Sequence, residues 1–237
     1  YEITYGDWSS DVCSSDLGSR GGVVFGRWEA SLQPDQSTQQ IADEDQTRAQ
    51  IYALLGRLLM SAPDADLLAK LAAFAGGETE LGQALVALAA TARRMDPGRL
   101  REEYQDVFIG VARGEVMPYA SYYLTGFLHS KPLANLRGDM ARLGIVRADG
   151  VPNPEDHIGS LCEMMAGLIT GAFDATADLP AQRRFFDAHI APWAPRFFAD
   201  LEGAKNAVFY MPVARLGRLF IDIEIQAFAL VAQDQAA

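Results

Sequence analysis

The stretch PNPEDHIGSLCEMMAGLIT, Pro152 to Thr170, is the most informative part of the sequence. After its first acids, apolar residues recur every three or four positions, which is the period of a helix with one buried face. At about 100° per residue, one arc of this helix holds the large apolar side chains and His157. The opposite arc holds Asp156, Glu163 and only small residues between them. Because each glycine lowers helix stability by about 1 kcal/mol relative to alanine, we expect another segment to approach this small-residue face closely.

The acids at the start of this helix have two interpretations. In the structural one, Asn153 is the N-cap, Pro154 takes the first helical position, and Glu155 and Asp156 stabilise the positive end of the helix dipole. In the functional one, Asp156 and Glu163, roughly 10 Å apart along the axis, meet the cationic side chains of a bound peptide. The small-residue face leaves the same choice open, because either a neighbouring helix of the chain or a peptide in a groove can cover it.

Other candidate chemistry in the sequence is weak. His157 falls on the apolar arc, where a lone histidine is more often a core residue with satisfied ring nitrogens than a ligand. The three histidines, His129, His157 and His189, lack the spacing of a metal site, and Cys162 has no second thiol near it. No glycine-rich phosphate loop follows a strand. We therefore expect no metal, no cofactor and no catalytic centre.

Helical periodicity continues through most of the chain and places about nine helices with short connections. Asp96 and Pro97 have the N-cap and first-position signals of a helix over residues 96–110. Ser130 is expected to cap the next long helix, and Gly144 to end it. We find no alternation typical of a sheet and no internal repeat, so the predicted fold is all-α, one bundle of about nine to eleven helices over residues 33–237. The other apolar stripes fall at 51–59, 67–74, 81–95, 119–127, in two helices of 181–202 broken near Pro192, and at 212–232.

The first residues differ from the rest of the chain. Residues 1–32 have no sustained period, and the composition changes at about Gln33. The segment DWSSDVCSSDL, Asp7 to Leu17, resembles the translation of a sequencing adapter. We expect residues 1–32 to be an unstructured, artefactual extension and exclude them, together with Cys13, from fold reasoning. The alternative is an ordinary N-terminal tail.

Composition narrows the classes of partner. Hydrophobic residues make up 49% and charged residues 22% of the 237 residues, as in globular proteins. The net charge of -11 argues against nucleic acid and anionic membranes and favours a cationic partner. No run of about twenty apolar residues and no export signal is seen, so we expect no stable membrane insertion and a cytoplasmic location.

Four blocks of the sequence together resemble one family. EEYQDVFIG (102–110), MPYASYY (117–123), PEDHIGSLCEMMAGL (154–168) and FFDAHIAPWAPRFFADLE (185–202) are similar to successive signature segments of the TorD/DmsD/NarJ chaperones of redox-enzyme maturation. The resemblance runs from about Asp45 to Glu224. It implies an all-helical, non-enzymatic, cytoplasmic chaperone. Such a chaperone binds the twin-arginine signal peptide of a molybdenum-cofactor oxidoreductase and delays export until the cofactor is inserted.

The resemblance also indicates which residues bind the peptide. Asp156 and His157 match the family motif, with Glu155 beside them, and the run SLCEMM (160–165) departs from the commoner pattern. The segments MPYASYYLTGF (117–127) and KPLANLRGDMARLGI (131–145) are most similar to members associated with formate dehydrogenases. The expected peptide-binding residues are Glu155, Asp156, His157 and Ser160, together with Glu163, which follows from the helical wheel and not from the resemblance. Tyr122, Tyr123 and Phe127 share one helical face and are expected to line the apolar part, with plain core packing as the alternative.

Two other functions remain open at this point. The chain is alternatively a helical cofactor- or nucleotide-binding protein that assists molybdenum-cofactor insertion, or a purely structural partner subunit. The sequence also leaves open whether the protein is a monomer or a domain-swapped dimer.

Overall fold

The computed structural model describes residues 2–3, 43–148, 151–173 and 176–234. This part of the chain is helical except for connecting segments and two short strands, β1 (Glu2–Ile3) and β2 (Val146–Arg147), which pair in parallel. The order of elements confirms the prediction of an all-α fold with about nine to eleven helices. The helices are α1 Asp43–Met60, α2 Ala65–Ala72, α3 Glu80–Ala92, α4 Pro97–Tyr104, the π-helical turn η1 Gln105–Ile109, α5 Ala120–Thr125, α6 Lys131–Arg142, α7 Ile158–Thr170, α8 Leu179–His189, α9 Ala194–Glu202 and α10 Tyr210–Asp234.

The segment 1–32, expected to be foreign to the fold, lies outside the described residues apart from β1. Its artefactual origin stays a prediction. Within the described ranges, no helix combines the length and the apolar character that crossing a bilayer requires.

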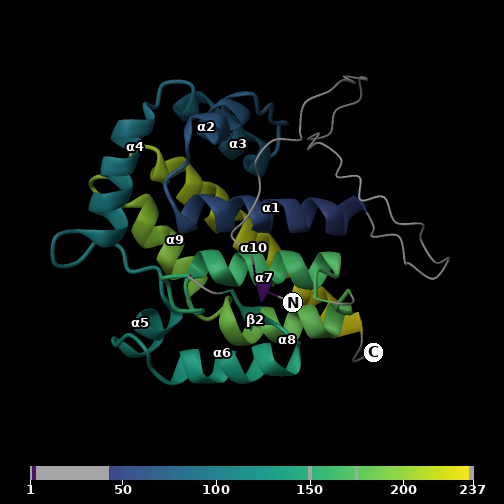
Figure 1. The fold of residues 1–237 in the computed structure, drawn as a ribbon. Coiled ribbons are helices and arrows are strands. Elements are labelled where there is room, and N and C mark those ends of the chain that lie inside the picture. Colours follow the sequence, from purple (N-terminus) through teal and green to yellow (C-terminus); the bar gives the residue numbers. More distant parts are fainter. Residues whose placement is uncertain (1, 4–42, 149–150, 174–175, 235–237) are drawn as a thin grey trace.

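Helices α1 and α7 pack against each other along the centre of the bundle (Figure 1). The contact is close because glycines lie on both sides of it. A Cβ atom added to Gly159 would lie 2.6 Å from Cγ of Met60 and 3.1 Å from the carbonyl oxygen of Gly56. A Cβ added to Gly56 would lie 2.8 Å from Cγ of Glu163. The small-residue face of α7 is therefore covered by a neighbouring helix, as the structural interpretation predicts.

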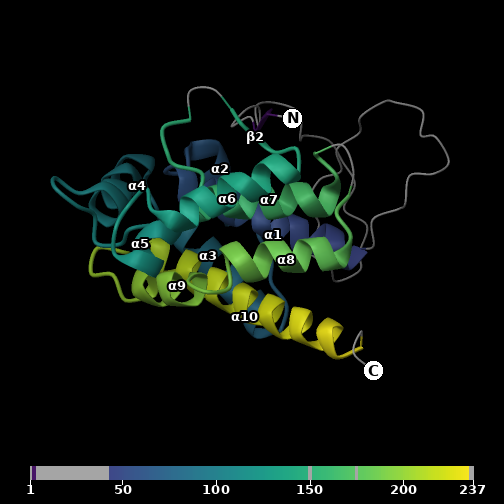
Figure 2. The same ribbon diagram turned by 90° about the horizontal axis from the view of Figure 1, so that it is seen from below.

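Aromatic side chains from α1 and from the C-terminal part of the chain form much of the core. Helix α8 ends at His189 and α9 starts at Ala194, so the predicted break near Pro192 is confirmed. Helix α9 packs along α10, and Figure 2 shows the two side by side on the outside of the bundle. The largest fully buried aromatic side chains are Tyr52, Phe186, Trp193, Phe197, Phe198, Phe209 and Tyr210.

Local start and stop signals are mostly as predicted. The carboxylate of Asp96 accepts hydrogen bonds from Gly98 N at 2.9 Å and Arg99 N at 3.1 Å. Gly144 follows α6 with φ of 70°, a conformation that favours glycine. Ser130 does occupy the N-cap position of α6, but its side chain makes no capping hydrogen bond there.

A buried ion pair joins the first helix to the last. The guanidinium of Arg48 donates to both carboxylate oxygens of Glu224, at 2.8 and 2.9 Å. Tyr52 OH donates to the same carboxylate at 2.9 Å, and Glu224 is only 1% exposed. The pair, with Glu224 buried and Arg48 partly exposed, links α1 to α10, and helical periodicity alone did not predict it.

Candidate functional site

Helix α7 begins later than the sequence predicts. Its N-cap is His157, whose Nδ1 accepts a hydrogen bond from Gly159 N at 3.0 Å. The expectation of Asn153 as N-cap, with Glu155 and Asp156 in the first turn, is therefore wrong. The reason is a tertiary contact: the backbone of His157 pairs with that of Tyr119 in an antiparallel bridge, which holds His157 in an extended conformation after a turn at Glu155 and Asp156.

His157 is a buried, neutral capping residue. It is 1% exposed, and its ring meets the ring of Tyr119 edge-on at 5.2 Å between centroids. Burial lowers the pKa of His157 to about 3, so the ring is uncharged at neutral pH. Since Nδ1 accepts from Gly159 N, the ring proton lies on Nε2. Of the two interpretations of this residue, the core histidine matches its position.

Asp156 holds the start of α5. Its Oδ2 accepts a hydrogen bond from Ser121 N at 2.8 Å, and its backbone oxygen accepts one from Ala120 N at 3.0 Å. The N-cap residue of α5, Tyr119, makes no side-chain capping bond, so Asp156 supplies the missing acceptor. Asp156 is 1% exposed. The predicted role of Asp156 as an open contact for a cationic peptide therefore needs correction, because a helix N-terminus already uses its carboxylate.

Glu155 is paired with an arginine of α6. Nε and Nη2 of Arg137 donate to the two carboxylate oxygens at 3.1 and 2.9 Å. Nη1 of Arg147 lies 4.0 Å from Oε1 of the same carboxylate. Burial alone would raise the pKa of Glu155, but the hydrogen bonds from Arg137 outweigh it, and the pKa lies below its usual value. Glu155 is thus an ionised, paired carboxylate.

Glu163 faces α1 instead of an open groove. Its Cγ packs against Gly56, and its Oε2 is buried with no hydrogen-bond partner among the described residues. Burial raises its pKa to about 7, and the attraction of Arg57 offsets only part of this. The predicted furrow between Asp156 and Glu163 does not exist in this arrangement, because α1 fills it.

Ser160 lies in the same buried layer. It is 3% exposed, and its hydroxyl lies 3.7 Å from Sδ of Met60. It also borders a small recess with a volume of about 10 Å³ next to Glu155. That volume holds about one water molecule. The recess therefore admits neither a peptide side chain nor a cofactor while its walls are in place.

The predicted aromatic residues differ from one another in exposure. Tyr123 belongs to the edge of the core, since its ring packs on Trp193 and its OH donates to Asp200 at 2.9 Å. Tyr122 is half-buried and carries the guanidinium of Arg113 over its ring at 4.9 Å. Phe127 is 75% exposed. Leu124 and Leu128, beside it in the chain, are 43% and 40% exposed.

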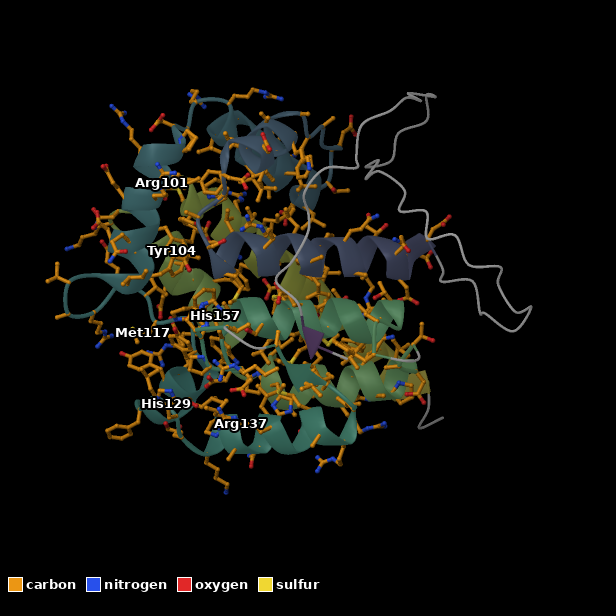
Figure 3. All side chains as sticks on the ribbon, in the orientation of Figure 1. Arg101, Tyr104, Met117, His129, Arg137 and His157 are labelled. Atoms are coloured by element: carbon orange, nitrogen blue, oxygen red, sulfur yellow. The ribbon has the colours of Figure 1, made fainter. Side chains whose placement is uncertain are left out.

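We call Tyr122, Leu124, Phe127 and Leu128 the α5 surface. It lies at the end of the bundle where α5 meets α6, and Figure 3 shows His129 and Arg137 at this end, with His157 above them at the start of α7. The structure thus brings Asp156 and His157 to the start of α5, whereas Glu163 lies in the contact of α1 with α7. Of the predicted residues, Phe127 is the most exposed. Among the described residues no cluster of three or more His, Cys, Asp or Glu could hold a metal ion.

Sequence reasoning missed a second acid with a capping role. Oε1 of Glu103 accepts hydrogen bonds from the backbone N–H groups of Val208, Phe209 and Tyr210, at 2.8 to 2.9 Å. Glu103 therefore caps the start of α10 from α4. The available signal was its place in the buried stripe of α4, three residues after Leu100. An acid on an apolar face indicates a specific buried acceptor.

Comparison with known proteins agrees with this fold and these motifs. A family model described as the nitrate reductase delta subunit matches residues 75–199, just over half of the chain. The chain belongs to this family of TorD-like redox-enzyme maturation chaperones. The resemblance seen in the four sequence blocks is thereby confirmed.

Several curated relatives of this TorD-like chain are named chaperone protein TorD. The protein from Aliivibrio salmonicida is 25% identical over 138 residues, which is 55% of this chain and 64% of the relative. The protein from Aeromonas salmonicida is 28% identical over 165 residues, 67% of this chain and 73% of the relative. The chain thus spans less than two thirds of the length of the Aliivibrio salmonicida protein.

A solved structure shares the fold of the TorD-like chain. It is described as a candidate redox enzyme maturation protein from Archaeoglobus fulgidus, with a TM-score of 0.51 and 22% sequence identity. The similarity covers 83% of this chain and 99% of that one. At this identity the likeness concerns the fold alone.

Proposed function

We propose that this TorD-like chain is a non-catalytic cytoplasmic chaperone that binds the twin-arginine signal peptide of a molybdenum-cofactor oxidoreductase before export. The observation that carries the proposal is the α5 surface, an exposed apolar patch beside the motif on which the family resemblance depends. Relatives named chaperone protein TorD support the same role.

The α5 surface suits the apolar part of such a peptide. Leu124, Phe127 and Leu128 are all more than a third exposed and lie within one short stretch of the chain, and clustered exposed apolar side chains mark interaction sites. Helix α5 is short, but its start is held by Asp156 and its end by Gly126 in the left-handed conformation. Leu124 is thus presented by a fixed helix, which lowers the entropy cost of binding, and Phe127 N donates to Thr125 Oγ1 at 3.3 Å just after it.

Charge supports a cationic leader. The net charge of -11 produces a field that attracts positively charged segments. Asp156 and His157 contribute to this proposal by positioning α5 and α7, since both are buried. The motif residues are then scaffold for the binding surface and do not touch the apolar part of the peptide.

Titration calorimetry with a synthetic leader tests the proposal. A twin-arginine peptide should bind more tightly than its twin-lysine version, and Leu124→Asp should weaken binding at least tenfold. The matched control is Val86→Asp on α3, because Val86 is 44% exposed and Leu124 43%. Unchanged binding by Leu124→Asp would place the peptide elsewhere. Absence of binding to every variant would reject the signal-peptide role.

The client enzyme is proposed from the sequence resemblance. The segments 117–127 and 131–145, which contain α5 and α6, are similar to members associated with formate dehydrogenases. We therefore propose a formate dehydrogenase as client. Affinity capture from the native cytoplasm, followed by identification of the captured preprotein, checks this; capture of a different oxidoreductase would correct the client and retain the chaperone role.

A further inference from the structure

We propose that Glu155 is a binding site for an arginine guanidinium, that Arg137 occupies it in the free chain, and that an arginine of the client leader exchanges with Arg137. The inference rests on the proposed function for the identity of the client. The site itself is defined by contacts within the chain.

The pairing of Glu155 with Arg137 has the geometry of specific guanidinium recognition. Two nitrogens of one guanidinium reach the two oxygens of one carboxylate, at 3.1 and 2.9 Å. A lysine ammonium cannot make this pair of parallel hydrogen bonds from one planar group. A site of this kind therefore discriminates arginine from lysine, which is the discrimination that a twin-arginine leader requires.

The two partners differ in how firmly they are held. The side chain of Glu155 is 9% exposed, whereas that of Arg137 is 53% exposed. The backbone on both sides of Glu155 is fixed, because His157 N donates to Pro154 O and the next residue, Asp156, is bonded to α5. Arg137 projects from the outer part of α6. The arginine is thus the partner that can leave, and the buried carboxylate is the fixed receptor.

The surroundings of Glu155 favour exchange over simple departure. A buried carboxylate left without a cation is strongly destabilised, so Arg137 leaves readily only when another cation takes its place. Arg147, at 4.0 Å, is a second arginine of the chain near the same carboxylate. The recess beside Glu155 has a volume of only about 10 Å³, so an incoming guanidinium must take the place of Arg137 and cannot bind next to it.

Location connects this site with the proposed peptide surface. Glu155 immediately precedes Asp156, which holds the start of α5, and Arg137 lies on α6, which packs against α5. A leader whose apolar segment covers the α5 surface therefore has its cationic part close to α6 and Glu155. Binding of the leader and displacement of Arg137 are coupled in this arrangement.

The exchange predicts a gain of affinity on removing the internal competitor. If Arg137 leaves Glu155 free in about a tenth of molecules, Arg137→Ala should bind the twin-arginine leader about tenfold more tightly. The matched control is Arg142→Ala, on the same helix, since Arg142 pairs with Asp139 and not with Glu155. Glu155→Gln should remove the preference for arginine over lysine.

The outcomes separate the two proposals. A wild-type chain that prefers the twin-arginine leader, together with unchanged or weaker binding by Arg137→Ala, overturns the exchange and leaves the proposed function standing. If no variant distinguishes arginine from lysine leaders, the proposed function falls, and a second measurement decides the guanidinium site.

That second measurement needs no leader. Ethylguanidinium at millimolar concentration should raise the melting temperature of Arg137→Ala, because it refills the vacated place, and should not raise that of Arg142→Ala. Ethylammonium is the control ligand, with one ammonium in place of the planar group. Equal effects of the two ligands, or equal effects on the two variants, would overturn the guanidinium site.

Discussion

Asp156 caps a helix that begins 36 residues earlier in the chain, through a hydrogen bond of 2.8 Å from Ser121 N to its Oδ2. The carboxylate is buried, and the backbone oxygen of the same residue accepts from Ala120 N. An acid that the sequence places on a binding surface is thus a structural acceptor. The acid fixes the helix that carries the α5 surface, so the motif and the proposed peptide site are coupled through this bond.

Asp156→Ala should lower the free energy of unfolding by about 1–3 kcal/mol, the range for removing a buried charged acceptor. Asp156→Asn should lower it less, because the amide oxygen still accepts from Ser121 N. Urea unfolding measures both, and hydrogen exchange at the Ser121 amide should accelerate in the alanine variant. Exposed Asp106→Ala is the control, expected within about 0.5 kcal/mol of wild type. If Asp156→Ala has the stability of this control, the capping role is wrong.

Glu163 should make the stability of the protein depend on pH. Its pKa is about 7 in the folded chain and 4.5 as the ordinary value, so the folded state holds the proton more tightly. The contribution of this tighter proton binding to the free energy of unfolding is fully present below about pH 4.5 and is lost as the pH rises through 7. The shift corresponds to at most about 3 kcal/mol.

Glu163→Gln checks this pH dependence. The variant should be more stable than wild type at pH 8, with a smaller difference at pH 5, in urea unfolding followed across that range. Arg57 is the charged group that acts on Glu163 from α1. Glu102→Gln, at an exposed position on α4, should follow the wild-type curve. Parallel curves for wild type and Glu163→Gln would contradict the burial of an unpaired carboxylate at the contact of α1 with α7.

Two helix glycines, Gly159 at the contact of α1 with α7 and Gly138 on the outside of α6, give predictions of opposite sign. Gly159→Ala should destabilise the protein by about 1–3 kcal/mol, because the added Cβ lies 3.1 Å from the backbone oxygen of Gly56 and 2.6 Å from Met60 Cγ. Gly138→Ala on exposed α6 should stabilise it by up to about 1 kcal/mol, since its Cβ would meet only Arg142, at 4.0 Å. Thermal unfolding of both variants measures the signs. A stabilising Gly159→Ala would show that the helices are not in close contact.

Local signals predicted the fold because they act within a few residues. Asp96 with Pro97 starts α4 and Gly144 follows the end of α6, as their local chemistry requires. The helical period likewise separates α8 from α9 around Pro192. None of these features depends on a distant part of the chain, so the all-α class could be read from the residues themselves.

The candidate site was predicted less well because distant contacts determine it. The helical wheel assumed that the helix already includes Asp156, but pairing with residues 118–121 keeps 154–157 outside it. The wheel also identified the small-residue face correctly without identifying its neighbour, which is Gly56 of α1. Phe127 was predicted from its spacing with the tyrosines, and its exposure follows from the turn that ends α5 at Gly126.

The buried pair of Arg48 and Glu224 should dominate the stability of the contact between α1 and α10. Glu224→Ala should lower the free energy of unfolding by about 3–5 kcal/mol, because it leaves the partly buried guanidinium of Arg48 without the carboxylate that holds it at 2.8 and 2.9 Å. Tyr52→Phe removes one hydrogen bond to the same carboxylate and should lower it by about 1–3 kcal/mol.

A double-mutant cycle of Arg48→Met and Glu224→Met isolates the pair. Arg48→Met leaves the buried carboxylate of Glu224 without its cation, and Glu224→Met leaves Arg48 with only Asp45 as an ion-pair partner. The double change replaces both charges by apolar side chains of similar length, so the double variant should be more stable than the sum of the single effects predicts. Guanidine unfolding of the four proteins measures the coupling. The control pair is Arg183 and Asp187, which are neighbours on the outer turns of α8 and should couple by less than about 1 kcal/mol. Additive effects at Arg48 and Glu224 would contradict the pair, because two residues that do not interact contribute to the free energy of unfolding independently.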